Sequence, residues 1–103
     1  MASDKEYLDY ILEQLSLLDG ITHRAMMGEY ILYYRGRIFG GIYDNRFLVK
    51  ETKASEKLMP DAQREIPYDG AKKMLLVEEV DDKLFLSELV NSMYADLPER
   101  KKV

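Results

Sequence analysis

The residues of this sequence that could bind another molecule are concentrated in its middle third, where basic and aromatic side chains alternate. They are Arg24, Arg35, Arg37, Arg46 and Lys50, interleaved with Tyr30, Tyr33, Tyr34, Phe39 and Tyr43. Aromatic rings beside arginines on a sheet can stack the bases of single-stranded nucleic acid. Tyr and Arg are also enriched where proteins bind each other. A third interpretation places the rings in the core and the arginines at hairpin turns, where charge keeps sheet edges soluble.

From this stretch we predict a candidate binding surface on one face of a sheet. Its members are Arg24, Tyr30, Tyr33, Arg35, Arg37, Tyr43 and Arg46. Residues 35–40 place Arg and Ile where the RNA-recognition signature requires an aromatic and a small residue, so that signature does not match. We therefore expect the surface to bind a protein partner or a second copy of the chain. A nucleic-acid-binding module that uses the arginines on phosphates is the alternative.

Few residues could perform acid–base or covalent chemistry. His23 is the single histidine. A Ser/His/Asp triad needs a nucleophile on a strained turn in addition to a histidine, and no such motif is present. A surface or edge-strand histidine is the simpler interpretation. Without a catalytic constellation, we expect that the chain is not an enzyme.

Two further groups of residues are compatible with a ligand but have simpler explanations. An acidic cluster is formed by Glu78, Glu79, Asp81 and Asp82. On a strand, Glu78 and Glu79 would point to opposite faces, while the two aspartates suit a helix start. The glycines at 36, 40 and 41 follow neither common phosphate-loop pattern. Gly36 instead indicates a turn, and Gly40-Gly41 indicates a bulge or the close approach of a helix to the sheet. We predict no metal, no cofactor and no catalytic residue.

Composition restricts the class of protein. The chain has 103 residues, no Cys, 47% hydrophobic residues and a formal charge of −4, which favours one folded domain over residues 1–103 without disulfides. Residues 23–57 contain seven basic and four acidic side chains and form the only cationic zone. That excess is small for a dedicated nucleic-acid binder. The sequence has no signal-peptide pattern and no long apolar run, so we expect a cytoplasmic protein without membrane insertion.

The basic and aromatic residues of the middle third must be held in place by the secondary-structure elements around them. Apolar residues at helical spacing predict a helix over 4–18, with Ser3 and Glu6 as a capping box and a left-handed Gly20 after its end. Residues 22–50 predict a three-stranded antiparallel meander, with its first extended segment over 22–34, its second strand over 37–43 and its third over 46–50. Large apolar side chains at both parities predict that at least part of the sheet is covered on two sides or meets another chain, in which case one face is an interface.

The second half predicts a short helix, a fourth strand and a closing helix. Thr52 is expected to cap a helix over 53–59 that ends before Pro60. An irregular segment then leads to a strand over 73–78 and an amphipathic helix from Asp81 to Leu97, followed by a frayed tail over 98–103. The predicted class is α+β.

One stretch resembles a known family. Nine residues agree in register with the signature of the TfoX (Sxy) N-terminal domain, R-R-M-F-G-G-Y-G-L-Y-x-x-G-x-x-F-G. They are Arg24, Met26, Gly28, Tyr30, Leu32, Tyr33, Gly36, Phe39 and Gly40. The likeness continues through Tyr43, Asp44, Leu48, Lys50 and the pair Pro67-Tyr68 to the closing helix. Ala25, Met27 and Glu29 depart from the signature, which has Arg, Phe and Gly at these places.

The resemblance implies a standalone member of that family with an α+β fold of the secretion-chaperone-like or YjbR-like kind. It also implies a role in regulating competence for DNA transformation, in which longer relatives act as transcriptional co-regulators and not as enzymes. We therefore expect a regulatory or adaptor domain that acts through protein binding by its sheet face.

Overall fold

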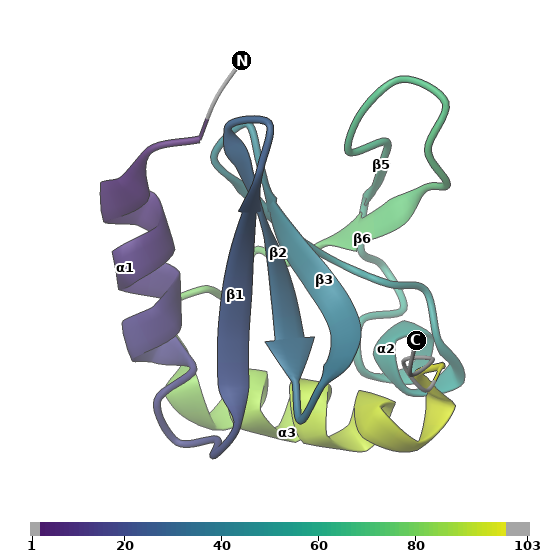
Figure 1. Cartoon of the computed structure of the whole chain (residues 1–103). Helices are drawn as coiled ribbons and strands as arrows, with labels where there is room; N and C mark the ends of the chain where they lie inside the picture. The colour runs from purple at the N-terminus through teal and green to yellow at the C-terminus, as the bar shows by residue number, and fades with distance from the viewer. Residues whose placement is uncertain (1–2, 99–103) are drawn as a thin grey trace.

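The computed structural model describes residues 3–98, which form one antiparallel sheet with helices packed against it (Figure 1). The strands lie in the order β1-β2-β3-β4-β6-β5. Their bounds are β1 Ile21–Met26, β2 Glu29–Tyr34, β3 Arg37–Tyr43, β4 Arg46–Val49, β5 Arg64–Glu65 and β6 Met74–Leu76. The helices are α1 Lys5–Gln14, α2 Lys53–Leu58 and α3 Lys83–Met93, the last continued by a 3₁₀ turn over Tyr94–Asp96. The predicted α+β class is confirmed.

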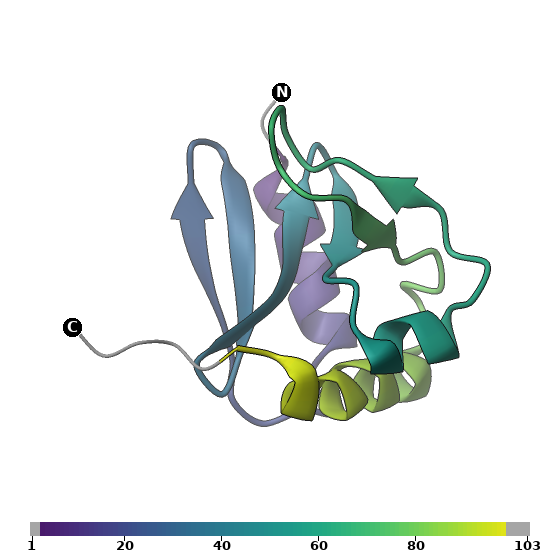
Figure 2. The same cartoon turned by 90° about the vertical axis from the view of Figure 1, so that its right-hand side faces the viewer.

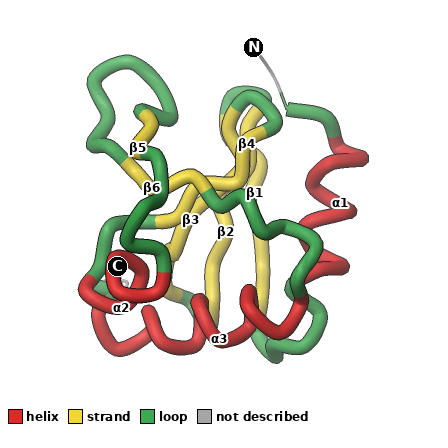
Figure 3. Tube along the Cα trace, turned by 180° about the vertical axis from the view of Figure 1, so that it is seen from behind, coloured by secondary structure: helices red, strands yellow, loops and turns green. Residues whose placement is uncertain are grey.

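The helices give the sheet two different faces. α1 runs along one face, and α3 crosses below the strands near one end (Figures 1 and 3). Fully buried side chains from α1, α3 and the strands form a single core on this helix-covered face. They include Leu8, Ile11, Leu32, Phe39, Phe47, Leu75, Leu86, Leu89 and Met93. Figure 2 shows the opposite face, which we call the open face: α1 lies behind the sheet, and the loop between β5 and β6 lies in front.

The first predicted strand is wrong, because residues 22–34 form two strands and not one. Met27 and Gly28 both have positive φ angles, of 51° and 84°, and make a tight two-residue turn between Met26 and Glu29. Two positive φ angles are the mark of the hairpin turn that matches strand twist. Methionine is an unusual residue at the first of these positions, which is why the turn was missed. The meander therefore has four strands, β1 to β4, in place of the predicted three.

The expected capping box at Ser3 is also wrong. The N-cap of α1 is Asp4, whose side chain makes no capping hydrogen bond. The Ser3 hydroxyl instead donates to Glu29 Oε1 at 2.6 Å and accepts from the Asn45 N–H at 3.0 Å. Ser3 thus joins the start of α1 to the β1–β2 turn, next to Glu29, and to the β3–β4 turn, which contains Asn45. Sequence spacing identifies a capping pair only when no distant acceptor competes for the hydroxyl.

The first helix ends earlier than predicted. α1 stops at Gln14, and Leu15 and Leu18 lie in the turns that follow, where Leu15 is fully buried and Leu18 half-buried. Leucines packing from a turn keep the apolar spacing of a helix, so periodicity overestimated its length. Gly20 has a φ of 91°, as the predicted left-handed glycine requires.

The glycine pair in β3 lies at a bulge, as one of its sequence interpretations predicts, whereas the other predicted interpretation, the close approach of a helix, is wrong. The β2–β3 register shifts after Leu32, so Phe39 is an extra residue beside Gly40. A Cβ on Gly40 would lie 2.2 Å from the Leu48 carbonyl oxygen of β4. The approaching group is therefore a neighbouring strand, and β3 curves at this point.

The second half follows the prediction closely. Thr52 and Ser55 form a capping box at α2, and the Asp82 side chain accepts from the Phe85 N–H at the start of α3. β6 is shorter than the predicted strand, and the two-residue strand β5 was not predicted. Of the predicted frayed tail, residues 99–103 lie outside the described part of the chain. Within residues 3–98, no helix is both long and apolar enough to cross a membrane.

Candidate partner-binding face

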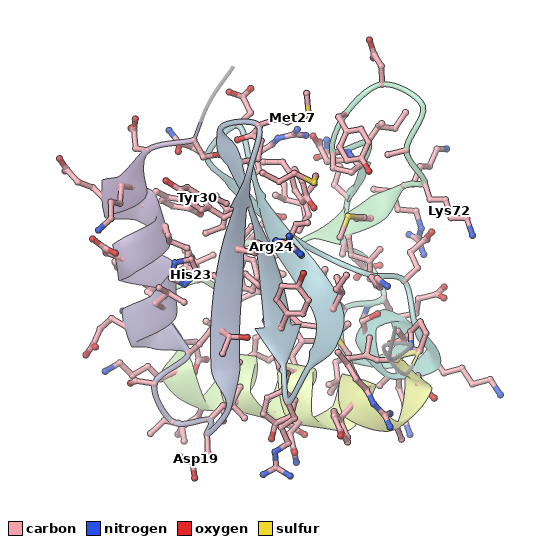
Figure 4. The ribbon with its side chains drawn as sticks, in the orientation of Figure 1. Asp19, His23, Arg24, Met27, Tyr30 and Lys72 are labelled. Atoms are coloured by element: carbon pink, nitrogen blue, oxygen red, sulfur yellow. The ribbon has the colours of Figure 1, made fainter. Side chains whose placement is uncertain are left out.

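Strand alternation decides which side chains reach the open face. In β1, His23 is directed toward α1, whereas Arg24 lies on the opposite side (Figure 4). Arg24 pairs in register with Ile31 of β2, and Ile31 with Gly41 of β3, and directly paired residues share a face. The open face therefore combines an exposed arginine on the edge strand with half-buried aliphatic side chains in the centre.

The edge strand β1 is the most exposed strand of the sheet. Every residue of β1 after Ile21 is exposed, and β1 pairs only with β2. The Arg35 N–H donates to the Gly20 carbonyl at 2.9 Å. Because bonded and non-bonded pairs alternate in an antiparallel ladder, the backbone groups of Ile21, His23 and Ala25 point away from β2. β1 thus presents free donors and acceptors to solvent.

A cavity of about 560 Å³ lies on the open face. One wall is the sheet, and the other is formed by the loop over residues 66–73, the start of α2 and the segment after α3. The residues that line it are Met26, Ile31, Ile38, Gly40, Tyr43, Lys50, Glu51, Thr52, Pro67, Tyr68, Ala71, Lys72, Lys73, Met74, Asp96, Leu97 and Pro98. It is a concave site with mainly apolar walls and several lysines.

Two tyrosines stand in the wall of this cavity. The Tyr43 ring lies over Gly41, where a Cβ would be only 2.6 Å from its Cε2 atom. The ring centroids of Tyr43 and Tyr68 are 6.0 Å apart. Burial, followed by the proximity of Tyr68, raises the pKa of the Tyr43 hydroxyl. Tyr43 therefore presents a neutral hydroxyl to the cavity at physiological pH.

The basic groups of the cavity are close enough to repel one another. Burial, followed by the charge of Lys72, lowers the pKa of the Lys50 ammonium. Figure 4 shows Lys72 projecting from the loop between β5 and β6. Lys50, Lys72 and Lys73 form no ion pair with any acidic side chain in the described part of the chain.

The structure does not bring all seven predicted surface residues together. By strand register, Arg24, Tyr33 and Tyr43 belong to the open face, and Arg46 pairs with Tyr43. Tyr33 and Tyr43 are buried, however, with only 7% and 6% of their surface exposed, so the prediction that they form an exposed surface is wrong. Tyr30 lies on the helix-covered face, where its ring meets the His23 ring edge-on at 6.2 Å. Arg35 is at the β2–β3 turn, with its guanidinium 5.2 Å from the Tyr34 ring centre.

The other two arginines make internal contacts. Arg37 donates to the carbonyls of Tyr94 and Leu97 and lies 4.3 Å from the Tyr94 ring centre, so it holds the end of α3 against the sheet. Arg46 forms an ion pair with Glu65 at 2.5 Å and donates to the Tyr43 carbonyl. The binding role of the seven residues therefore stays a prediction. Because Arg37 and Arg46 are engaged in internal contacts, the candidate face is centred on β1 and the cavity.

Sequence reasoning missed Lys50, Lys72, Tyr68 and Met74 as partners in one cavity. The only signal in the sequence was that Lys50 and Pro67-Tyr68 both belong to the positions that resemble the family. The residues are far apart in the sequence, and only the fold brings the end of β4 and the 66–73 loop together. Among residues 3–98, no cluster of three His, Cys, Asp or Glu side chains could hold a metal ion.

Comparison with known proteins places the chain in a family. The model of the TfoX N-terminal domain matches residues 13–97. An "Uncharacterized 12.7 kDa protein in trpE 5'region" of Spirochaeta aurantia is 31% identical over 80 residues, which cover 78% of this chain and 70% of that protein. No solved structure matches the chain, so the secretion-chaperone-like and YjbR-like grouping stays a prediction. Sequence signature and family match agree, and the chain belongs to the TfoX N-terminal domain family.

Proposed function

We propose that this chain is a non-enzymatic regulatory or adaptor domain that binds a partner protein along β1 and the adjoining open face. Membership of the TfoX N-terminal domain family fits a competence-related regulatory domain. The observation that carries the binding role is the exposed edge strand, whose outward backbone groups at His23 and Ala25 can pair with an added strand.

The chemistry of β1 selects the kind of partner segment. The strand contains His23 and Arg24 but no acidic residue, and Arg24 is exposed without an ion pair to the described residues. An extended segment with an acidic side chain near Arg24 would add main-chain hydrogen bonds and a charge pair. A second copy of this chain would bring no acid from its own β1, so a different protein is the better occupant.

Nucleic acid is less well supported as the partner. Of the four arginines in the alternative hypothesis, Arg37 and Arg46 are engaged with carbonyls or Glu65. Arg24 lies within β1, opposite Ile31, whereas Arg35 lies at the turn between β2 and β3, opposite Gly20. Phosphate binding depends on several neutralising contacts along a backbone track, which this arrangement does not provide.

The test uses an edge-strand proline with a matched control. Ala25→Pro removes an outward N–H that β2 does not use, and proline is tolerated at such edge positions. Ala25→Val changes the same side chain and keeps the N–H. The tagged chain and both variants are used to capture proteins from source-cell extract, with circular dichroism as the folding control. We expect one protein to be retained by wild type and Ala25→Val and lost with Ala25→Pro.

A charge reversal provides an independent arm. Arg24→Glu should also lose the captured protein, whereas Arg35→Glu at the distant turn should retain it. Equal capture by wild type, Ala25→Pro and Arg24→Glu would contradict the proposal. Nuclease-sensitive, salt-dependent binding would favour the nucleic-acid alternative, and a dimer of the purified chain in light scattering would favour self-association.

A further inference from the structure

We propose that the cavity on the open face binds a small organic carboxylate with an apolar body. This site shares the open face with the proposed partner-binding surface, but it lies between the sheet and the 66–73 loop, whereas the strand-pairing groups lie along the free side of β1. Its volume of about 560 Å³ lies in the range of ligand pockets, roughly 300–1,000 Å³.

The apolar part of the ligand follows from the floor of the cavity. Ile31 and Ile38 on the sheet and Met74 at the start of β6 are half-buried side chains, each without full cover from the protein. Pro67 and Ala71 supply further apolar surface from the loop. A hydrocarbon or aromatic group placed between these walls would remove its own apolar surface and that of the cavity from water. Burial of apolar surface is the main source of affinity in such sites.

We expect a negatively charged ligand because the basic side chains that line the cavity outnumber its unpaired acidic side chains. Of the two acidic groups in the lining, Glu51 accepts from Arg64 Nε at 2.6 Å, and Asp96 accepts from the Ala54 N–H at 3.4 Å at the start of α2. The three lysines have no such partner among residues 3–98. Asp96 keeps its negative charge, because a backbone N–H does not neutralise a carboxylate. Three lysines against this one carboxylate still leave the cavity with a net positive charge.

Lys50 is the group best placed to bind the carboxylate. It is half-buried at the end of β4, and its ammonium is disfavoured by burial and by Lys72, which together lower its pKa. A bound carboxylate would bury Lys50 further, but its negative charge would stabilise the ammonium and so offset both effects. The neutral Tyr43 hydroxyl provides a hydrogen-bond donor in the same wall. A lysine pair with apolar walls suits a singly charged organic acid better than a bare inorganic anion.

The test uses octanoate as the probe and amide chemical shifts of the purified chain as the readout. 1-Octanol has the same chain without the charge, and acetate has the charge without the chain. We expect octanoate to shift the amides of Ile31, Lys50 and Met74 in a saturable way, with affinity at least about tenfold tighter than that of 1-octanol or acetate.

A charge-deleting variant and its matched control complete the experiment. Lys50→Met keeps the aliphatic stem and should weaken octanoate by about tenfold. Lys57→Met on the exposed side of α2 should leave binding unchanged. No saturable shift, shifts confined to other surfaces, equal binding of octanoate and either control probe, or an unchanged affinity of Lys50→Met would overturn the proposal. The measurement needs no partner protein, so it is independent of the edge-strand proposal.

Discussion

The two faces of the sheet differ in how completely the protein buries its apolar side chains and provides partners for its polar ones. On the helix-covered face, Phe39 and Phe47 are fully buried with their rings edge to face, and the Tyr34 hydroxyl donates to Asn91. On the open face, Lys50 is half-buried without an acidic partner among residues 3–98, and Ile38 is only partly covered. Incomplete satisfaction costs stability, and positions that carry such a cost are where binding functions are found. The comparison assigns folding to the helix-covered face and is consistent with the proposed recognition role of the open face.

The largest expected effect comes from deleting a ring on the helix-covered face. Phe47→Ala should lower the free energy of unfolding by about 3–5 kcal/mol, because it leaves a cavity in a closed core. Ile38→Ala on the open face should cost about 1 kcal/mol, since its side chain is already partly in water. Urea denaturation of both variants measures the contrast. Equal losses would show that the two faces contribute equally to stability.

A glycine in the centre of the sheet gives the next effect. Gly40→Ala places a Cβ against the Leu48 carbonyl, where only a shift of backbone can relieve the contact. We expect the free energy of unfolding to fall by about 1–3 kcal/mol. Gly36→Ala, at a position with open space but a φ of 83°, tests backbone strain without crowding. If Gly40→Ala unfolds at the same urea concentration as wild type, the close packing of β3 and β4 is wrong.

A smaller loss is expected at the polar junction between α1 and the hairpins. Ser3→Ala removes the hydroxyl that bonds Glu29 and Asn45, and should cost about 1–2 kcal/mol. Ser87→Ala is a suitable control, because its hydroxyl bonds only the Leu84 carbonyl within α3. Thermal unfolding of the two variants compares them. A larger loss for Ser87→Ala would contradict the role of Ser3 as the link.

Lys50 provides the smallest effect, with the opposite sign. Because the pKa of Lys50 is lowered on folding, this group adds stability only above its unfolded pKa of 10.5 and loses that contribution as pH falls. At neutral pH the buried charge is a cost, so Lys50→Met should raise the urea midpoint slightly. The difference from wild type should shrink as pH approaches 10.5. A destabilised Lys50→Met would mean that the ammonium has a stabilising partner.

The sequence predicted elements that depend on local chemistry and missed those that depend on distant contacts. The sequence predicts Thr52 as a helix cap and Asp82 as a helix-start residue, and the N–H donors that bond their side chains lie within one turn of each. Ser3 was misassigned because its real partner, Glu29, is far along the chain. The Met27-Gly28 turn was missed because its left-handed methionine has no strong propensity for that conformation.

The candidate site could be predicted only in part from the sequence, because it too depends on contacts between residues far apart in the chain. Tyr43 and Arg24 were selected by residue type, and both reach the open face. Arg37 and Arg46 were selected by the same criterion, yet their guanidinium groups bind Leu97 and Glu65 across the fold. Residue type indicates what a side chain can do, whereas its neighbours in space decide whether it is available.

Hydrogen exchange of the β1 amides, with and without the captured partner protein, tests the assignment of recognition to the edge strand most directly. In the free chain, the outward amides of His23 and Ala25 should exchange quickly, and those of Thr22 and Arg24, bonded to β2, more slowly. On partner binding, we predict that His23 and Ala25 become protected while the exposed side of α3 is unchanged. A bound partner that leaves the exchange of His23 and Ala25 unaltered would contradict the account.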